Sequence, residues 1–452
     1  MFDITYLGRR CFRLIKRYPR TSTVVSLLVV FCIGIWVGRE IEFSKITDYF
    51  RSYTDPEQSD VTKSVEPGIV HRQILDNGVL TNILAISPDA ADIRPYRALS
   101  AGIGTESLVS LARRHKALAA INGGFFEMVG TFRGESVGAL KIDGEWRSEP
   151  EQGRAVIGFR RVNGNIEAYI DRIALRQELL LPDGSTLLID GMNRSRGRNE
   201  LVLYRPHFHA VTLTMPDGVE VIVRNSEVVG IHNRHGSSRI PADGYVLSAS
   251  GKKQRDLLAH IKQGDTVEVR EMVIPERVGD SNLWASFAHI IGGGPLLLRD
   301  GIAPSTQAYE REGFDQAFHS FWHPRTAVGK KSDGTLLFVT ITATAAGVRR
   351  GVMLPRLAEL FLEWGATDAL NLDGGNSSML VIRNEVVSVK QKDVAKPELK
   401  DKLKYPARDK PQPPRIRAER NVKTARGNRR VRPMPRQQGR AISDAILIFL
   451  KP

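Results

Sequence analysis

Seven Asn-Gly or Asp-Gly dipeptides lie between short apolar or alternating runs, and this pattern constrains the fold more than any other feature. They are Asn77-Gly78, Asp143-Gly144, Asn163-Gly164, Asp183-Gly184, Asp217-Gly218, Asp300-Gly301 and Asp333-Gly334. Such a dipeptide between apolar runs is the strongest short-range signal for a β-hairpin. The sequence therefore predicts an α+β fold, with a strand-rich mixed sheet core and a few flanking helices.

Two segments show helical periodicity instead. Residues 105–115 and 354–364 carry apolar side chains at spacings of three and four, which is typical of a helix with one buried face. Thr105 is placed to cap the first helix, Pro355 lies near the start of the second, and Gly365 follows its end. Both helices are predicted to pack against the sheet.

The N-terminal segment has the charge pattern of a membrane anchor. Six Lys or Arg side chains precede residue 21, and residues 21–38 contain no charged side chain. A run of this length can span a bilayer, and the basic side stays in the cytoplasm by the positive-inside rule. We expect a cytoplasmic basic segment over 1–20 and an uncleaved transmembrane signal anchor over 21–38, with the following domain periplasmic or extracellular. A cleaved export signal and a buried core helix are the alternatives.

Composition divides the remaining residues into three parts. Residues 39–72 are polar without clear periodicity and predict a stalk. Residues 390–440 contain eighteen Lys or Arg, five acidic residues and seven Pro, so they predict a basic, disordered insertion that cannot form a core of its own. Apolar residues 441–450 predict a closing strand. The folded domain is therefore expected over 73–389 plus 441–450.

The net charge of +15 does not indicate a nucleic-acid-binding domain. The positive charge is concentrated in residues 1–20 and 390–440, so the folded domain itself is slightly acidic. We expect the insertion to attract anionic envelope polymer or lipid and no nucleic acid, because the predicted topology holds it outside the cytoplasm. A solvated loop without a partner is the alternative.

Four glycine-centred motifs follow apolar strand-like runs and carry the polar residues of the candidate site. They are Asn122-Gly123-Gly124, Gly292-Gly293-Gly294, His323-Pro324-Arg325 followed by Thr326-Ala327-Val328-Gly329, and Asp373-Gly374-Gly375 followed by Asn376-Ser377-Ser378. Glycines lack a Cβ atom, so backbone N–H groups beside one polar side chain can approach a ligand closely. One such motif could be a tight turn without a ligand. Four in one domain indicate a binding site.

In this order, the motifs resemble those of the phosphodiester glycosidase family. The resemblance covers residues 119–379 and the closing strand. It rests on INGGFF at 121–126, VGALKIDG at 137–144, GMNRSR at 191–196, IGGGPLLLRDG at 291–301, PRTAVG at 324–329 and LNLDGG at 370–375. Two departures are visible: FVTITATAAG at 338–347 lacks an Asp-Gly-Arg-like turn, and Asn376 stands where the family has a third glycine. Members of the family cleave the bond between a sugar's anomeric carbon and a phosphodiester oxygen.

The resemblance implies roles for individual residues. Asp373 would supply a carboxylate near the anomeric carbon, Arg325 a planar fork for the phosphate, and Asn122 a hydrogen bond to a sugar hydroxyl. These three are the predicted catalytic residues. The predicted substrate-binding residues are Gly123, Gly124, Asn193, Arg194, Gly293, Gly294, His323, Gly374, Gly375, Ser377 and Ser378.

The sequence thus predicts an envelope-anchored hydrolase that cleaves a sugar-1-phosphodiester bond in a surface glycan or glycolipid. The alternative is a non-catalytic glycan-binding or scaffolding protein with the same fold, which the missing Asp-Gly-Arg-like turn favours. Glu127 and Glu135 are the best second carboxylates if the reaction needs one. No cofactor is predicted, because the histidine pairs at 207/209 and 232/235 lack a third metal ligand at regular spacing, and a divalent cation is left open.

Overall fold

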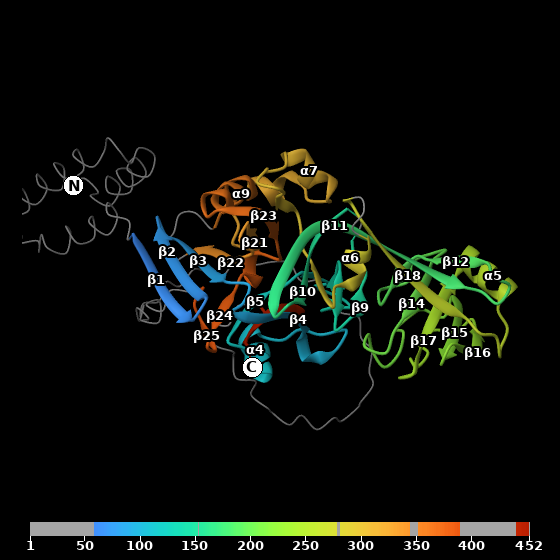
Figure 1. The fold of residues 1–452 in the computed structure, drawn as a ribbon. Coiled ribbons are helices and arrows are strands. Elements are labelled where there is room, and N and C mark those ends of the chain that lie inside the picture. The colour runs from blue at the N-terminus through green and yellow to red at the C-terminus, as the bar shows by residue number, and fades with distance from the viewer. Residues whose placement is uncertain (1–57, 152, 278–280, 344–350, 389–439, 452) are drawn as a thin grey trace, which may run out of the picture. The chain divides into compact units, whose positions relative to one another are not determined.

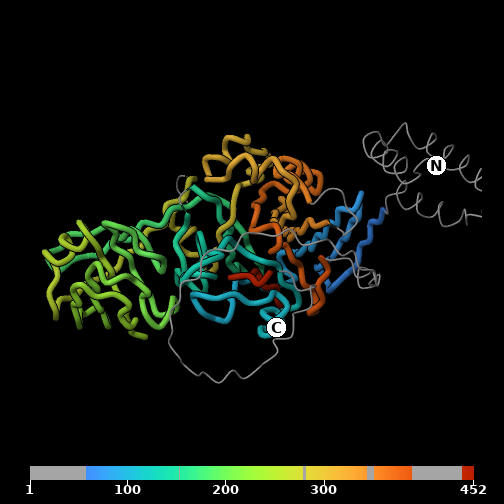
Figure 2. Tube along the Cα trace, turned by 180° about the vertical axis from the view of Figure 1, so that it is seen from behind, coloured from blue at the N-terminus to red at the C-terminus, as the bar shows by residue number. Residues whose placement is uncertain are grey.

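The computed structural model describes residues 58–451 apart from residues 152, 278–280, 344–350 and 389–439. The predicted cytoplasmic segment, the signal anchor and all but the last residue of the predicted insertion lie outside the described residues. Within the described part, no helix is long and apolar enough to cross a membrane. Figure 1 shows the strands and helices as a ribbon, and Figure 2 shows the chain trace from behind.

Two sheets carry most of the residues that the motifs single out. The larger has the order β1 (Ser59–Glu66), β2 (Ile69–Asp76), β3 (Val79–Ile86), β22 (Leu336–Ala343), β21 (Arg325–Lys331), β23 (Ala366–Asn371) and β20 (Leu296–Leu298). The smaller has the order β25 (Glu385–Val386), β24 (Leu380–Ile382), β5 (Ala119–Asn122), β26 (Asp444–Leu450) and β4 (Ala91–Arg97). The predicted closing strand is therefore confirmed as β26, which lies between β5 and β4.

Two further sheets and a short hairpin complete the strands. One sheet has the order β12 (Thr186–Ile189), β11 (Asn165–Leu180), β10 (Ala155–Val162), β19 (His289–Gly292), β8 (Leu140–Ile142) and β9 (Glu145–Ser148), with β18 (Glu268–Pro275) also paired to β11. The other has the order β13 (Gly191–Met192), β14 (Leu201–Tyr204), β17 (Gly244–Ser250), β15 (Gly218–Arg224) and β16 (Glu227–Asn233). The hairpin joins β6 (Phe125–Phe126) to β7 (Ser136–Val137). Among the described strands only β13 and β14 pair in parallel, so the strand-rich prediction is confirmed and the sheets are almost wholly antiparallel.

Five of the seven predicted turns connect neighbouring paired strands. At Asn77-Gly78 both residues have positive φ, 49° and 76°, as the tight hairpin turn requires. Asp300-Gly301 closes a short turn bridged by Arg299 and Ile302. The prediction for Asp217-Gly218 is wrong, because Gly218 begins β15. A Cβ atom on Gly218 would lie 2.2 Å from the carbonyl oxygen of Ala249, so close strand packing explains this glycine.

The predicted stalk is wrong over its last part, because residues 59–72 form β1 and the start of β2. Six of the eight residues of β1 are exposed, and β1 pairs only with β2 at the edge of the sheet. An edge strand with neither face buried needs no apolar alternation, which is why its polar sequence resembled a linker.

Both predicted helices are present. The first is α4 (Leu108–His115), which Ser107 caps by accepting a hydrogen bond from the N–H of Ser110, so the predicted Thr105 cap is wrong. The second is α9 (Leu354–Glu363), with Pro355 in its first turn and Gly365 at φ 83° after its end. The helices without a clear sequence signal are α5 (Gly251–His260), α6 (Ser281–Ser286), α7 (Thr306–Arg311) and α8 (Gln316–Ser320), with the 3-10 turns η1 (Ala98–Ser100) and η2 (Gly375–Ser377).

The main core lies between sheets that carry the motifs. Ile121 of β5, Ile157 of β10, Leu370 of β23 and Ile446 of β26 have no exposed surface and belong to one apolar cluster. Burying one such side chain contributes roughly 2 kcal/mol. The strand ends that bear the glycine motifs are therefore fixed on a packed support.

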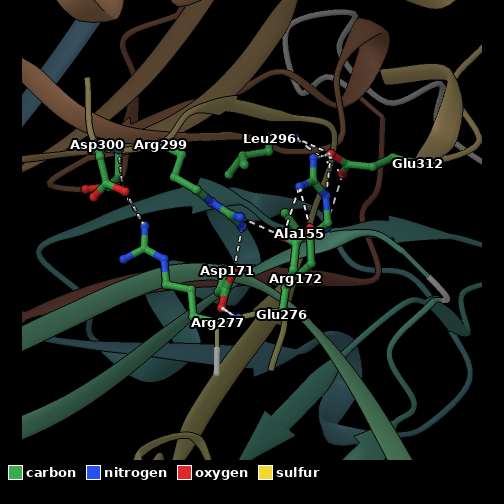
Figure 3. A network of polar contacts seen from close by, with 10 residues as sticks. Ala155, Asp171, Arg172, Glu276, Arg277, Leu296, Arg299, Asp300 and Glu312 are labelled. Carbon is green, nitrogen blue, oxygen red and sulfur yellow. Dashed lines mark hydrogen bonds and ion pairs between the residues drawn. The ribbon is translucent and has the colours of Figure 1, made fainter. Parts of the chain in front are cut away.

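A buried polar network fixes α7 to two sheets (Figure 3). Glu312 follows α7, and its carboxylate accepts hydrogen bonds from Arg172 Nε and Nη2 at 3.1 and 2.5 Å. The same carboxylate accepts from the N–H of Leu296 at 3.1 Å and of Ala155 at 3.2 Å. Because Leu296 directly follows the Gly292-Gly293-Gly294-Pro295 run, Glu312 also holds this motif in place.

Candidate active site

Two of the glycine motifs meet where β5 and β23 end. The N–H of Asp373 donates to the carbonyl oxygen of Gly123 at 3.1 Å, and Asn122 Nδ2 donates to the carbonyl oxygen of Asp373 at 2.7 Å. The third motif joins them, since the N–H of Gly375 donates to the carbonyl oxygen of Pro324 at 2.8 Å. The main chains of these distant segments are thus hydrogen-bonded into one rigid unit.

The Asp373 carboxylate is mostly buried and forms an ion pair with Arg440. Oδ2 of Asp373 lies 3.0 Å from Nη2 of Arg440, and the two side chains are 13% and 30% exposed. Burial raises the pKa of Asp373 above its ordinary value, while hydrogen bonding by Ser377 and the charge of Arg440 oppose that rise. The Asp373 carboxylate is therefore largely shielded from water and is paired with one cation.

Arg440 makes several further contacts. Its Nε and Nη2 donate to Ser377 Oγ at 3.1 and 2.6 Å, and its guanidinium lies 5.2 Å from the ring centre of Phe126. Nη1 faces the sulfur of Met128 at 2.8 Å. Arg440 is absent from the predicted site residues because it is the last of the many basic residues of 390–440. A signal did exist, since it lies just before an apolar strand whose register is fixed against β5.

A cavity adjoins the β6–β7 hairpin, and we call it the acidic cleft. It has a volume of about 350 Å³, and the ionisable side chains along it are Glu127, Glu135, Glu149, Glu151 and Arg194. Phe126 pairs with Ser136 in the hairpin, and the N–H of Glu127 donates to the carbonyl oxygen of Glu135 at 2.8 Å. The hairpin therefore connects the residues around Arg440 to the acidic cleft.

Glu135 is the most perturbed carboxyl group of this cleft. Burial raises its pKa to about 8, and the nearby Glu149 and Glu127 add to the rise, whereas Arg97 and Arg194 oppose it. Its side chain is therefore largely protonated at neutral pH and can donate a proton. Burial also raises the pKa of Glu149, which is paired with Arg194 at 2.7 Å.

A second cavity of about 220 Å³ lies on the other side of Glu135. Both cavities are lined by Glu135, Ser136 and Ser148, so these residues form a shared wall. Asn193 and His207 also line the second cavity. Burial lowers the pKa of His207 to about 4, so this histidine is neutral at physiological pH.

The hairpin is held by a buried pair on neighbouring strands. Asp444 Oδ1 accepts from the N–H of Gly124 at 2.8 Å, and Oδ2 accepts from Ser136 Oγ at 2.7 Å. Nη1 of Arg97 lies 3.9 Å from Asp444 Oδ2, and Nη2 of Arg97 donates to the carbonyl oxygen of Gly134 at 3.0 Å. Because Gly134 directly precedes Glu135, these contacts position the wall between the cavities.

The structure does not support the predicted phosphate fork at Arg325. Arg325 is 2% exposed, and its Nε donates to the carbonyl oxygen of Val352 at 3.1 Å. Its Nη2 donates to the carbonyl oxygens of Phe318 and Phe321 at 2.5 and 3.4 Å. These main-chain acceptors give Arg325 a structural role, and burial lowers its pKa to about 10.

Arg194 is also engaged by the protein itself. Its Nε donates to Glu149, its Nη1 to Glu200 and the carbonyl oxygen of Ser195, and its Nη2 to Glu200 and the carbonyl oxygen of Asp190. All five N–H groups thus have an acceptor. Arg194 braces one wall of the acidic cleft and has no donor left for a ligand in this conformation.

Asn122 and Asn193, predicted to bind sugar hydroxyls, are hydrogen-bonded to the protein. Asn122 Oδ1 accepts from Thr326 Oγ1 at 2.8 Å and from the N–H of Met379 at 3.0 Å, and its side chain is fully buried. Asn193 Nδ2 donates to the carbonyl oxygen of Arg147 at 2.9 Å. Both amides therefore hold main-chain segments together, and the predicted sugar contacts are not supported.

The paired glycines chiefly allow main chains to pack closely. A Cβ atom on Gly123 would lie 2.2 Å from Asp444 Oδ1, and one on Gly293 would lie 2.4 Å from the carbonyl oxygen of Asn371. Close packing also explains Gly124 and Gly374, whose added Cβ atoms would lie 2.8 Å from the carbonyl oxygens of Gly292 and Pro324. Gly294 donates its N–H to the carbonyl oxygen of Asn371 at 2.8 Å.

The remaining predicted residues lie around these motifs. Gly375 has φ 59° and open space beside it, and it begins the turn η2 that carries Ser377. Ser378 Oγ is buried and has no hydrogen-bond partner among the described residues. His323 pairs through its main chain with Val352. Around Asp373, the structure thus brings together Gly123, Gly375 and Ser377, while Asn193 and Arg194 lie along the two cavities.

The two histidine pairs do not form one centre. The rings of His232 and His235 are 5.2 Å apart, whereas His207 lines the second cavity and lies 3.8 Å from Glu145. Within residues 58–388 and 440–451, where described, no group of three or more His, Cys, Asp or Glu side chains could hold a metal ion.

Comparison with known proteins agrees with the motifs. Residues 217–427 match the model of the phosphodiester glycosidase family. The predicted resemblance to this family is therefore confirmed over these residues.

Two curated relatives match parts of the chain. An uncharacterized protein of Rickettsia conorii is 26% identical over 234 residues, which cover 51% of this chain and 77% of that protein. The bovine N-acetylglucosamine-1-phosphodiester alpha-N-acetylglucosaminidase is 27% identical over 99 residues, which cover 22% of this chain and 18% of the bovine protein. This chain thus aligns with less than a fifth of the bovine enzyme.

A solved structure resembles nearly the whole chain. A hypothetical protein from Synechocystis superposes with a TM-score of 0.67 and 22% sequence identity, over 88% of this chain and 64% of that one. At this identity the likeness is one of fold.

Proposed function

We propose that the chain is a hydrolase that cleaves a sugar-1-phosphodiester at the bond between the anomeric carbon and the phosphate oxygen. The observation that carries the proposal is a pair of carboxyl groups in different environments. Glu135 is buried with its pKa raised to about 8, whereas Asp373 is paired with Arg440 at 3.0 Å. Burial raises the pKa of both groups, but Asp373 also has the direct ion pair with Arg440 that favours its ionised form. A difference of this kind between two carboxyl groups is typical of acid and base assignments.

The two groups would take opposite roles in hydrolysis. Asp373, ionised beside Arg440, would accept a proton from the attacking water. The oxygen of that water adds to the anomeric carbon at the same time. The C1–O bond breaks, and the phosphate monoester leaves with its oxygen. Glu135 would donate its proton to that leaving oxygen, so one proton is taken up and one is released. Because a phosphate is already a good leaving group, the acid accelerates the reaction less than it would for an alcohol.

The acidic cleft is also large enough for a small ligand. The acidic cleft has a volume of about 350 Å³ and borders the second cavity through Glu135. Small-molecule pockets have volumes of roughly 300 to 1,000 Å³, so one sugar ring with its phosphate fits this scale.

A non-catalytic glycan-binding or scaffolding protein is the second candidate, and one observation favours it. Arg325 and Asn122, two of the three predicted catalytic residues, bind only the protein in this conformation. Incubation of the purified chain with p-nitrophenyl and nucleotide sugar phosphodiesters separates the two functions. A hydrolase releases free sugar with turnover, whereas a binding protein retains the diester intact.

We further propose that the enzyme acts at the cell envelope, on a surface glycan or glycolipid. The uncharged run 21–38 behind six basic residues supports a single-pass anchor with the N-terminus in the cytoplasm. The basic residues of 390–440 support attraction to anionic polymer or lipid. Reporter fusions after residue 60 test the topology, and a reporter active in the cytoplasm would contradict it. Co-sedimentation with anionic vesicles at low and high salt tests the attraction.

A further inference from the structure

Arginines near the glycine motifs differ in how many N–H groups the protein already uses. All five N–H groups of Arg194 have an acceptor, and Arg325 directs its Nε and Nη2 to main-chain carbonyls. Arg97 donates to the carbonyl oxygens of Ala101 and Gly134 and to the hydroxyls of Ser136 and Ser443. These three side chains act as internal braces.

Arg440 is different from the buried Arg325 because its guanidinium is partly exposed and one edge lacks a strong acceptor among the described residues. Nε and Nη2 bind Ser377 and Asp373, but within the described residues Nη1 contacts only the sulfur of Met128. A thioether sulfur is a weak acceptor. The side chain is 30% exposed, so an anion can reach Nη1 without displacing the Asp373 ion pair.

We propose that Arg440 binds the phosphate of the substrate and joins phosphate binding to the positioning of Asp373. The inference rests on the proposed function and replaces the phosphate fork that the sequence placed at Arg325. Guanidinium groups bind phosphate oxygens with short, charge-assisted hydrogen bonds and a fixed planar geometry. With Arg440 between them, a diester anion and the Asp373 carboxylate can lie close together, because the cation reduces the repulsion between the two negative groups.

The ring of Phe126 fixes the plane of the guanidinium in this arrangement. Arg440 lies 5.2 Å from the centre of that ring, and its other contacts come from η2 and from the end of β23. A guanidinium held on several sides loses little freedom when it binds an anion. A lysine at this position keeps the charge but loses the planar contact with Phe126 and the bonds to Ser377.

Arg154, which precedes β10, offers a matched control because it contacts the neighbouring aromatic ring of the same hairpin. Successive residues of a strand point to opposite faces, and the Arg154 guanidinium lies 5.6 Å from the ring centre of Phe125, the residue next to Phe126. Arg154 also lies 4.8 Å from the ring centre of Phe314. Arg154→Gln thus removes one arginine stacked on a neighbouring aromatic ring and leaves the Asp373 ion pair intact.

The test compares two substrates of the same sugar, one a phosphodiester and one a neutral p-nitrophenyl glycoside. For Arg440→Gln we expect kcat/KM for the phosphodiester to fall about tenfold to a hundredfold more than kcat/KM for the neutral glycoside, since a charge-assisted hydrogen bond is lost with the phosphate only. Arg440→Lys should regain part of the difference, and Arg154→Gln should show none. An equal fall on both substrates, or a selective fall for Arg154→Gln, would overturn the inference.

A binding measurement separates this inference from the proposed function. Titration calorimetry with inorganic phosphate and with a sugar 1-phosphate, on the full chain, should give weaker binding for Arg440→Gln than for wild type, with the melting temperature recorded for both. If the wild-type chain hydrolyses neither substrate but Arg440→Gln loses anion binding, the proposed function fails and the assignment of Arg440 stands. Unchanged anion binding by a folded Arg440→Gln protein would refute the assignment even if the wild-type chain is active.

Discussion

Asp373 Oδ2 and Arg440 Nη2 lie 3.0 Å apart, although 67 residues separate them in the sequence. The contact depends on β26, which pairs with β5 so that Ala445 lies opposite Asn122. That register places the start of β26, four residues after Arg440, beside the end of β5, where the carbonyl oxygen of Gly123 accepts the N–H of Asp373. Closure of the sheet by the last strand therefore completes the candidate site.

Asp373→Asn should abolish most of the turnover and leave the fold intact. The amide keeps the shape of the side chain but cannot accept a proton from water, so kcat should fall about a hundredfold to ten-thousandfold. The lost ion pair involves a partly exposed partner, which limits the effect on stability. Steady-state rates and thermal melting of both proteins check this. Wild-type kcat in the variant would remove Asp373 from the mechanism.

Glu135→Gln should change the pH dependence of both activity and stability. Wild-type activity should decline as pH rises through about 8, because the proton donor ionises there. The variant should be less active than wild type, and its activity should not decline over this pH range.

Glu135→Gln should stabilise the protein at high pH. The folded-state pKa of Glu135 is raised, so the folded protein holds a proton that the unfolded chain loses first, and wild-type stability falls between about pH 5 and pH 8. Glu135→Gln removes this loss and should melt higher than wild type near pH 8, with a smaller difference near pH 5. Identical melting curves at both pH values would show that Glu135 is not held protonated.

Arg325→Lys should destabilise the protein more than it impairs phosphate recognition. Lysine cannot reproduce the hydrogen bonds to Val352, Phe318 and Phe321 in one plane, so we expect the free energy of unfolding to fall by about 2 kcal/mol. Denaturant unfolding measures this. A stable variant with a greatly raised KM for the phosphodiester would restore Arg325 as the phosphate residue.

Glu312→Gln should destabilise the network shown in Figure 3. The carboxylate is 1% exposed and accepts bonds from Arg172 and from two main-chain N–H groups. Removing its charge therefore breaks the shorter of the two ion pairs of Arg172, which keeps only the pair with Glu276 at 3.1 Å. A loss of about 3 kcal/mol is expected. Arg356→Gln, on the exposed face of α9, is the control and should change stability by well under 1 kcal/mol. Equal melting of the two variants would contradict the role of Glu312.

Local sequence chemistry predicted the elements of the fold well. Asn77-Gly78 indicates a hairpin because both residues of the turn must adopt positive φ, and Asn and Gly are the residue types that do so readily. The apolar spacing of α9 and the closing strand β26 were likewise predictable, because burial imposes a period on the residues themselves. The stalk was mispredicted because β1 buries neither face and so has no such period.

The direction of individual polar side chains could not be predicted. Arg325 and Asn122 have the residue types of a ligand site, yet both bind the protein itself. Their partners are the hydroxyl of Thr326 and main-chain groups that include those of Phe318, Val352 and Met379. Tertiary packing determines those partners, and a sequence motif does not specify that packing. Arg440 was hidden for a related reason, since composition treats it as one of eighteen basic residues whereas strand register gives it a specific contact.

The most direct test of the account is hydrolysis of a sugar-1-phosphodiester by the purified full chain in water labelled with heavy oxygen, followed by mass spectrometry of both products. The account predicts turnover in which the label enters the free sugar, because water adds to the anomeric carbon, and it predicts that Asp373→Asn loses this activity. Label in the phosphate product, or retention of the intact diester without any turnover, would contradict the assignment of a glycosidase.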